Sequence, residues 1–216
     1  MATDVNPPGT AGVSPALEQA GGTPAVPGEV AVVFTLDREA TPFRRVNPGV
    51  NIIISGIGCR KARFTTQIAI EGFQPKLVIA AGFCGALAPH LVVGDIVTSP
   101  RIVTVNSLVA TPEAKRRLAD QTGAEAVDME SAEVAAVCAE YGVPCLAIRA
   151  VSDTVDTALS PGLVRLLSGG NVSVWKAIRA LVRRPAMLGE FRRLARDTKL
   201  AANKLAEELV RVIQSR

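Results

Sequence analysis

The sequence lacks several features that would place it in particular classes of protein. Hydrophobic residues make up 48% of its 216 positions, but none of their runs reaches the roughly 18 residues that a membrane-spanning helix needs. It has a single histidine, His90, which excludes a site built from several histidines, and its four cysteines form no Cys-x-x-Cys pair. The first residues are not a basic region followed by an apolar one, so we expect no secretory signal. We therefore expect a cytoplasmic protein with reduced thiols, no metal and no cofactor.

Charge is distributed unevenly along the chain. From Arg165 to the end there are twelve basic and four acidic residues, a net charge of +8, whereas the remainder carries −4. A basic helical face is usually only solvated, and we expect no nucleic-acid partner. The alternative is a peripheral contact with an anionic membrane surface through this region.

The chain divides into three parts by composition. Residues 1–28 are rich in Pro, Gly, Ala and Thr without any periodicity, which predicts a disordered tail. Residues 29–216 then form one domain. Its last part, 161–216, is basic and predicted to be helical, with a short helix starting at Pro161, a second over Trp175–Val182 and a long one over about 186–213. The long helix carries an apolar stripe at helical spacing, which we expect to pack on a sheet.

Six short apolar runs predict strands: Val30–Thr35, Asn51–Ser55, Leu77–Ala81, Gly94–Thr98, Arg101–Val105 and Cys145–Ala150. The runs are continuous and not alternating, as in strands that are covered on both faces. Helices are predicted between them over 59–71, over 111–122 with Thr111 as its cap, and over 129–141. The alternation predicts a single-domain, three-layer α/β fold with a mixed, largely parallel sheet flanked by helices. The two runs within 94–105 resemble a hairpin and suggest that the sheet is mixed.

Polar residues and glycines follow several of these runs. In open α/β sheets, ligands bind beyond the carboxyl ends of the strands. The groups at such positions are Asp37-Arg38-Glu39, Gly56-Ile57-Gly58, Gly82-Phe83-Cys84-Gly85 and Ser152-Asp153, with Asp128 and Glu130 at the start of a helix. Each alone is explained by a tight turn or by the helix dipole. Together they predict several carboxylates over one crevice.

Three motifs in this order resemble the nucleoside phosphorylase and nucleosidase superfamily, over about residues 30–160. They are Gly82–Leu87 with Val93–Val97 after it, Val127–Ser131, and Arg149–Asp153. Within the superfamily the chain looks most like methylthioadenosine/S-adenosylhomocysteine nucleosidases, and the stretch 111–131 with the basic end is also similar to hopanoid-associated nucleosidases. The resemblance implies a phosphorylase-like fold and a homodimer with an interface near the active site.

The resemblance also implies roles for single residues in breaking the N-glycosidic bond of a purine nucleoside. The ribose becomes positive in this reaction and the base negative. Asp153 matches the acid that protonates the base, which requires a raised pKa from burial and from Ser152. Glu39 matches the group that activates water, and Glu130 the group that binds the ribose hydroxyls. The other matching residues are Met129 under the sugar, Arg149 beside the carboxylates, and Gly82, Phe83, Cys84 and Gly85 in the turn.

Water is favoured over phosphate as the attacking group. Hexameric phosphorylases have an arginine and a hydroxyl residue where this chain has Ala80 and Phe83, although Arg60 or Arg63 could still bind an anion at a helix N-terminus. Phe83 also replaces a small polar residue, and the stretch between Val97 and Asp128, which supplies base contacts in the methylthioadenosine enzymes, is short. The alternatives are adenine release from an adenosyl-hopane-type lipid precursor, phosphorolysis of a purine nucleoside, and a catalytically degenerate binding protein.

Overall fold

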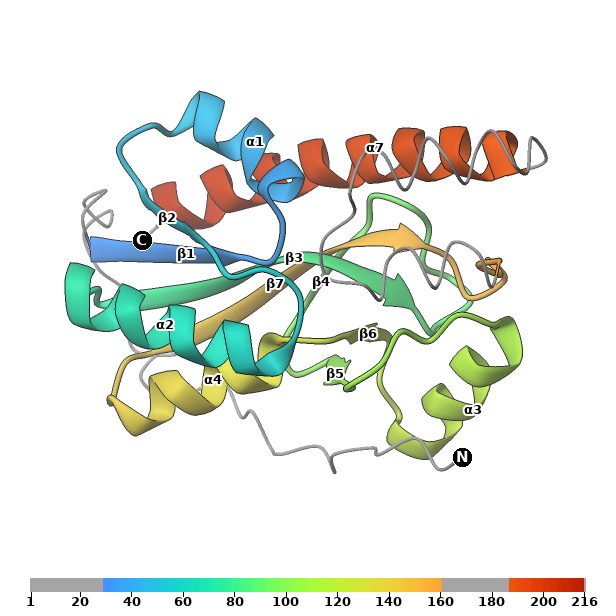
Figure 1. Cartoon of the computed structure of the whole chain (residues 1–216), viewed down its shortest axis with the longest axis horizontal. Coiled ribbons are helices and arrows are strands. Elements are labelled where there is room, and N and C mark those ends of the chain that lie inside the picture. Colours follow the sequence, from blue (N-terminus) through green and yellow to red (C-terminus); the bar gives the residue numbers. More distant parts are fainter. Residues whose placement is uncertain (1–28, 161–186, 216) are drawn as a thin grey trace.

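The computed structural model describes residues 29–160 and 187–215, which form one mixed sheet between two layers of helices (Figure 1). The strands are β1 (Val30–Phe34), β2 (Asn51–Ile54), β3 (Leu77–Ala86), β4 (Ile96–Thr98), β5 (Ile102–Thr104), β6 (Ala126–Asp128) and β7 (Cys145–Asp153). The helices are α1 (Asp37–Val46), α2 (Cys59–Phe73), α3 (Pro112–Thr122), α4 (Ser131–Glu140) and α7 (Met187–Gln214). The predicted α/β fold with a largely parallel sheet is confirmed.

Strand β3 is the centre of the sheet. On one edge it pairs in parallel with β7 from Val78 onward, and β7 also pairs antiparallel with β4. On its other edge β3 pairs in parallel with β1 as far as Ala81, and antiparallel with β6 at Gly85 and Ala86. The residues between these two partners, 82–84, therefore face a gap in the sheet where β1 has ended and β6 has not begun.

Each face of the sheet is covered by two helices (Figure 1). Because successive side chains of a strand point to opposite faces, β1 contributes Val32 and Phe34 to the core under α1 and α7, and Val33 to the core under α2 and α4. The predicted apolar stripe of the long helix is confirmed, since Leu205 and Leu209 of α7 are fully buried against this first face.

Three features of the fold differ from the sequence-based expectation. The runs within 94–105 do not form a hairpin, because β4 pairs with β7 while β5 pairs in parallel with β6. Helix α1 and strand β6 were not predicted, and β3 and β7 continue to Ala86 and Asp153, beyond their expected ends. The predicted tail over 1–28 and the two short helices within 161–186 lie outside the described residues.

Candidate active site

Glu39 lies at the gap in the sheet. It is in the first turn of α1, which starts directly after β1, and its side chain is buried. One carboxylate oxygen accepts hydrogen bonds from the amides of Thr35 (3.1 Å) and Leu36 (2.8 Å), and the other accepts one from the amide of Phe83 (3.1 Å). The unpaired stretch of β3 thus binds Glu39 where a neighbouring strand would otherwise bind.

The environment of Glu39 suits a group that takes up a proton near neutral pH. Burial raises the pKa of Glu39 from 4.5 to about 7, although the nearby Arg149 cation and the amides of Leu36 and Phe83 act in the opposite direction. A base with a pKa near 7 is both available and effective at neutral pH.

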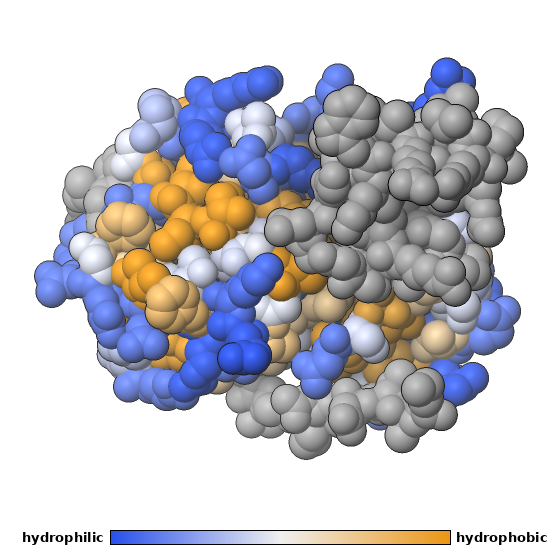
Figure 2. Space-filling model, in the orientation of Figure 1, coloured by the Kyte–Doolittle hydropathy of each residue, from blue (hydrophilic) through white to orange (hydrophobic). Residues whose placement is uncertain are grey.

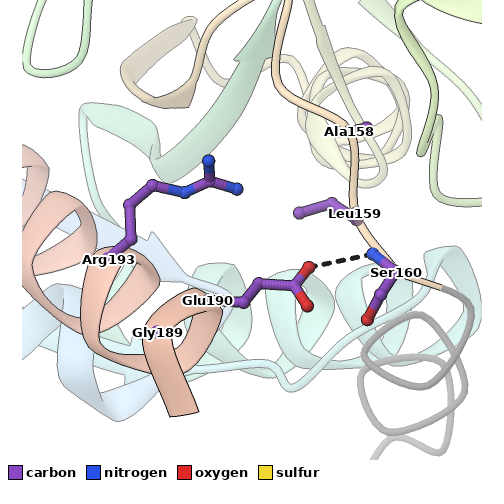
Figure 3. Close-up of a pocket in the computed structure, with 6 residues that line it drawn as sticks. All are labelled: Ala158, Leu159, Ser160, Gly189, Glu190 and Arg193. Carbon is purple, nitrogen blue, oxygen red and sulfur yellow. Dashed lines mark hydrogen bonds between the residues drawn. The ribbon is translucent and has the colours of Figure 1, made fainter. Parts of the chain in front are cut away.

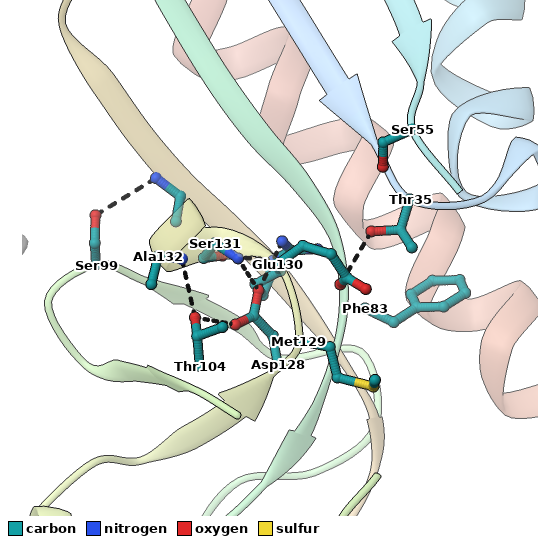
Figure 4. A network of polar contacts seen from close by, with 12 residues as sticks. Thr35, Ser55, Phe83, Ser99, Thr104, Asp128, Met129, Glu130, Ser131 and Ala132 are labelled. Carbon is teal, nitrogen blue, oxygen red and sulfur yellow. Dashed lines mark hydrogen bonds and ion pairs between the residues drawn. The ribbon is translucent and has the colours of Figure 1, made fainter. Parts of the chain in front are cut away.

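Glu130 is the second buried carboxylate of the site. Its two oxygens accept hydrogen bonds from the Thr35 hydroxyl (3.3 Å) and from the Gly58 amide (3.0 Å). Figure 4 shows Thr35 reaching the Glu130 carboxylate beside Phe83 and Met129. Burial raises the pKa of Glu130, and Arg149 opposes that shift. The ends of β1, β2 and β6 therefore all contribute to one acidic pocket.

Arg149 is the buried cation beneath these carboxylates. Its Nη2 lies 2.7 Å from Asp128, and its Nε donates to Ser131 (3.0 Å). Asp128 in turn accepts from the Thr104 hydroxyl (2.6 Å) and the Ser131 amide (2.9 Å), as Figure 4 shows. Arg149 is thus paired with Asp128, while its charge also acts on Glu39 and Glu130.

Gly82 is required by the position of Arg149. A Cβ atom at Gly82 would lie 2.3 Å from Nη1 of Arg149 and 3.1 Å from a carboxylate oxygen of Glu39. Nη1 itself is buried and has no hydrogen-bond partner among the described residues. The close approach of main chain, guanidinium and carboxylate therefore excludes any side chain at position 82.

Asp153 lies on the other edge of β3, at the end of β7. One of its oxygens accepts from the Ser152 hydroxyl (2.8 Å), which also contacts the carbonyl of Cys84 (3.2 Å). The other oxygen is bound by the ammonium group of Lys115, and a Cβ atom at Gly85 would lie only 3.2 Å from it. The predicted contact with Ser152 is thus present. The side chain is mostly buried as expected, but against a cation and not in apolar surroundings.

Lys115 was not predicted from the sequence. It lies in α3 between the half-buried Ala114 and the exposed Arg116, and its side chain is completely buried. One signal was present, because Lys115 is three residues before Leu118, so that both lie on the buried face of the helix. The helix itself was predicted correctly: Thr111 caps it by accepting a hydrogen bond from the amide of Ala114 (3.2 Å).

A cavity of about 320 Å³ is lined by Met129, the neighbour of Glu130, and by Gly58, whose amide donates to the Glu130 carboxylate. The residues that line it are Ile57, Gly58, Cys59, Arg60, Lys61, Asn106 and Met129. Arg63, one of the two arginines considered for anion binding, is instead paired with Glu133 and Glu140 on α4. Arg60 remains at the cavity, so the opening beside the carboxylates has both apolar and basic walls.

Phe83 lies in the unpaired stretch of β3, where its amide donates to Glu39. Its ring is partly buried against the core, and the guanidinium of Arg38 lies 5.8 Å from its centre. This distance is within the range of a cation–π contact. The departure from a small polar residue thus introduces an aromatic ring, with a cation next to it, at the gap beside Glu39.

A second cavity of about 490 Å³ lies between the segment after β7 and the start of α7 (Figure 3). Leu159 and Arg193 line it from opposite sides, and Glu190 accepts a hydrogen bond from the Ser160 amide (2.9 Å). As in the first cavity, none of the carboxylates discussed above is among its lining residues.

Two kinds of feature are not found in the described parts of the chain. Within residues 29–160 and 187–215, no group of three or more His, Cys, Asp or Glu side chains is placed to hold a metal ion. None of the helices described in these ranges is long and apolar enough to cross a membrane.

Known proteins share this sequence pattern and this fold. A sequence profile of the phosphorylase superfamily matches residues 38–103 and 99–166. The 5′-methylthioadenosine/S-adenosylhomocysteine nucleosidase of Anoxybacillus flavithermus is 31% identical, over 49% of this chain and 68% of its own.

Solved structures agree on the fold. The Helicobacter pylori 5′-methylthioadenosine/S-adenosylhomocysteine nucleosidase superposes with a TM-score of 0.64 at 17% identity, covering 87% of this chain and 98% of its own. The futalosine hydrolase of the same organism gives a TM-score of 0.61 at 17% identity, covering 84% and 95%. The buried site at the end of β3 coincides with the matched sequence, and the chain belongs to the phosphorylase superfamily.

Proposed function

We propose that the protein hydrolyses the N-glycosidic bond of a purine nucleoside. The observation that carries this proposal is the pair of buried carboxylates, Glu39 and Glu130, bound to main-chain amides at the gap beside β3. Breaking a glycosidic bond places positive charge on the ribose, and preorganised carboxylates stabilise such a charge more strongly in a buried site than in water.

The proposed roles follow from the position of each group. Glu39, with its pKa of about 7, takes the proton of the attacking water. Glu130 binds the ribose hydroxyls, next to Met129 under the sugar. Asp153, on the opposite edge of β3, protonates the leaving base. Arg149 orients the two carboxylates and limits their mutual repulsion.

Charge at the gap supports attack by water rather than by phosphate. The carboxylates gathered there are Glu39, Glu130 and Asp128, and the cations beside them are Arg149 and, next to Phe83, Arg38. When ionised, the three carboxylates exceed the two cations by one charge, which disfavours a phosphate dianion. Phe83 and the fully buried Ala80 also offer no polar side chain to an anion. Arg60 and Lys61 are the basic residues at the adjoining cavity.

A product analysis with and without inorganic phosphate tests the mechanism. We expect the protein to release free ribose derivative in phosphate-free buffer, at a rate that phosphate does not raise. Strict dependence on phosphate, with a sugar 1-phosphate as product, would show phosphorolysis instead, and Arg60→Met would then be the variant that reduces it.

The proposed substrate is an adenine nucleoside with a 5′ substituent, such as methylthioadenosine or S-adenosylhomocysteine. Support comes from the names of the similar nucleosidases and from the apolar part of the cavity at Ile57 and Met129. An adenosyl-hopane-type lipid precursor is the second candidate, because Arg192, Arg193 and Lys199 are exposed on α7 and could hold the protein at an anionic membrane. Binding to anionic vesicles at low salt tests this candidate, and failure to sediment with them would count against it.

The proposed quaternary structure is a homodimer formed through α2. Phe64 and Ile68 lie one helical turn apart on this helix and are 65% and 45% exposed. Figure 2 shows an apolar area on the face where β2 and α2 lie in Figure 1. Because α2 begins at Cys59, on the wall of the cavity, an interface on this helix would lie near the site.

A further inference from the structure

Lys115 is the one fully buried lysine among the described residues. Every donor of its ammonium group has an acceptor. Its ammonium group contacts Asp153 and donates to the carbonyls of Thr154 (2.7 Å) and Thr157 (3.3 Å). These three acceptors match its three donors. The contact fixes Asp153 and the segment that follows it, but it also places a transferable proton beside the proposed acid.

The groups around Asp153 show which of them can give it a proton. Lys115 is the cation in contact with it, the buried Cys84 thiol faces it from β3, and the neighbouring Arg116–Asp156 ion pair lies at the surface. The contact places an N–H donor of Lys115 against Oδ2 of Asp153, so Lys115 lies directly behind the proposed acid as a proton donor.

We propose that Lys115 is a positioning residue that supplies Asp153 with the proton for the leaving purine. This inference rests on the proposed function. Moving a proton from Lys115 to Asp153 removes two opposite charges from a buried site, so the cost of holding the ion pair away from water offsets part of the cost of the transfer. The proton acceptor on Asp153 is the oxygen that the ammonium already contacts.

The proton leaves Nζ of Lys115, passes to Oδ2 of Asp153 and ends on N7 of the purine. The electron pair of the C1′–N9 bond goes to the purine, and water forms the new bond to C1′ while its proton goes to Glu39. After the products leave, Glu39 releases its proton to solvent. Lys115 regains one through Asp153, whose side chain is 16% exposed whereas that of Lys115 is 0% exposed.

The test compares the pH dependence of kcat for wild type, Lys115→Met and Lys115→Gln, measured as adenine release from methylthioadenosine. We expect both variants to lose about 10²- to 10⁴-fold at neutral pH, the range for loss of acid catalysis, with little change in KM. The loss should shrink as the pH falls, because Asp153 then takes its proton from solvent. Arg116→Met, on the exposed side of the same helix, should keep the wild-type profile.

An equal loss at every pH would show a merely structural role and overturn the proposal, as would an unchanged profile. A double-mutant cycle of Lys115→Met and Asp153→Asn in thermal unfolding needs no substrate, and we expect the double variant to be less destabilised than the sum of the single ones. Additive effects would show that the side chains of Lys115 and Asp153 do not interact, and this result would overturn the proposal. If wild type releases no base from any nucleoside, the proposed function fails, while the cycle still reports on the pair.

Discussion

Glu39 accepts three main-chain hydrogen bonds at the gap of the sheet, and its charge changes near neutral pH. In the proposed reaction it must be ionised, so we expect kcat/KM to rise with pH through about 7. Glu39→Gln should reduce base release by about 10²- to 10⁴-fold and abolish this rise. A pH–rate profile of both proteins checks this, and a variant that keeps the wild-type rate would exclude Glu39 as the base.

The free energy of unfolding should fall as Glu39 ionises, whereas the rate of base release should rise. The Glu39 carboxyl ionises at 4.5 in the unfolded chain but at about 7 in the folded protein, so the folded protein binds the proton more tightly. Its contribution to stability is therefore present below pH 4.5 and is lost as the pH rises to about 7, by about 3 kcal/mol in all. Wild type should lose stability over this range relative to Glu39→Gln in denaturant unfolding. Parallel pH curves would contradict the shift.

The lack of free volume around Gly82 leads to a prediction about stability. Gly82→Ala places a methyl group against the Arg149 guanidinium and should cost about 1–3 kcal/mol of unfolding free energy, the usual cost of overpacking. Gly72→Ala is the matched control, since it lies in α2 with nothing near the added atom, and it should stabilise by about 0.5–1 kcal/mol. Equal effects of the two variants on the thermal midpoint would show that the site tolerates a side chain at 82.

At the scale of elements, α7 closes one face of the sheet through its apolar stripe. Leu209 is fully buried in that face, whereas Leu200 of the same helix is 45% exposed. Leu209→Ala should therefore cost about 2–5 kcal/mol, and Leu200→Ala much less. Denaturant unfolding of the two variants measures the difference. A similar small cost for both would mean that α7 is not part of the cooperative core.

The elements also show which parts of the fold the sequence determines locally. Strands β1, β2 and β7 and helix α3 have strong signals of their own, in apolar runs and in the Thr111 cap. Strand β6 has only three residues and exists through its pairing with β3 and β5. Short strands such as β4 and β5 take the partner that tertiary packing brings, and proximity in the sequence does not decide it.

In the candidate site, too, some residues could be predicted from the sequence and others depend on tertiary contacts. Glu130, Arg149 and Asp153 could be found because they lie in recognisable motifs, and Glu39 because it follows the first apolar run. Lys115 could not be assigned to the site, since its contact with Asp153 joins two segments that are far apart in the chain. The role of Gly82 likewise depends on Arg149, which reaches it across the β3–β7 pairing.

At the scale of the whole molecule, the exposed apolar residues of α2 predict self-association. Phe64→Asp should convert the proposed dimer to a monomer, because it replaces the most exposed large apolar side chain of α2 with a charge. Val92→Asp, at a residue that is 58% exposed elsewhere on the surface, is the matched control and should leave the mass unchanged. Analytical ultracentrifugation measures both, and a monomeric wild type would contradict the interface.

The whole molecule brings Glu39 and Glu130 together at the gap beside β3 and places Asp153 at the end of the neighbouring strand β7, and base release tests that arrangement most directly. Purified protein is incubated with a panel of purine nucleosides, including methylthioadenosine and S-adenosylhomocysteine, and free adenine is measured without phosphate. We predict adenine release by wild type and its loss in both Glu39→Gln and Asp153→Asn. No base from any nucleoside, or equal release by wild type and both variants, would contradict the account and favour a binding protein.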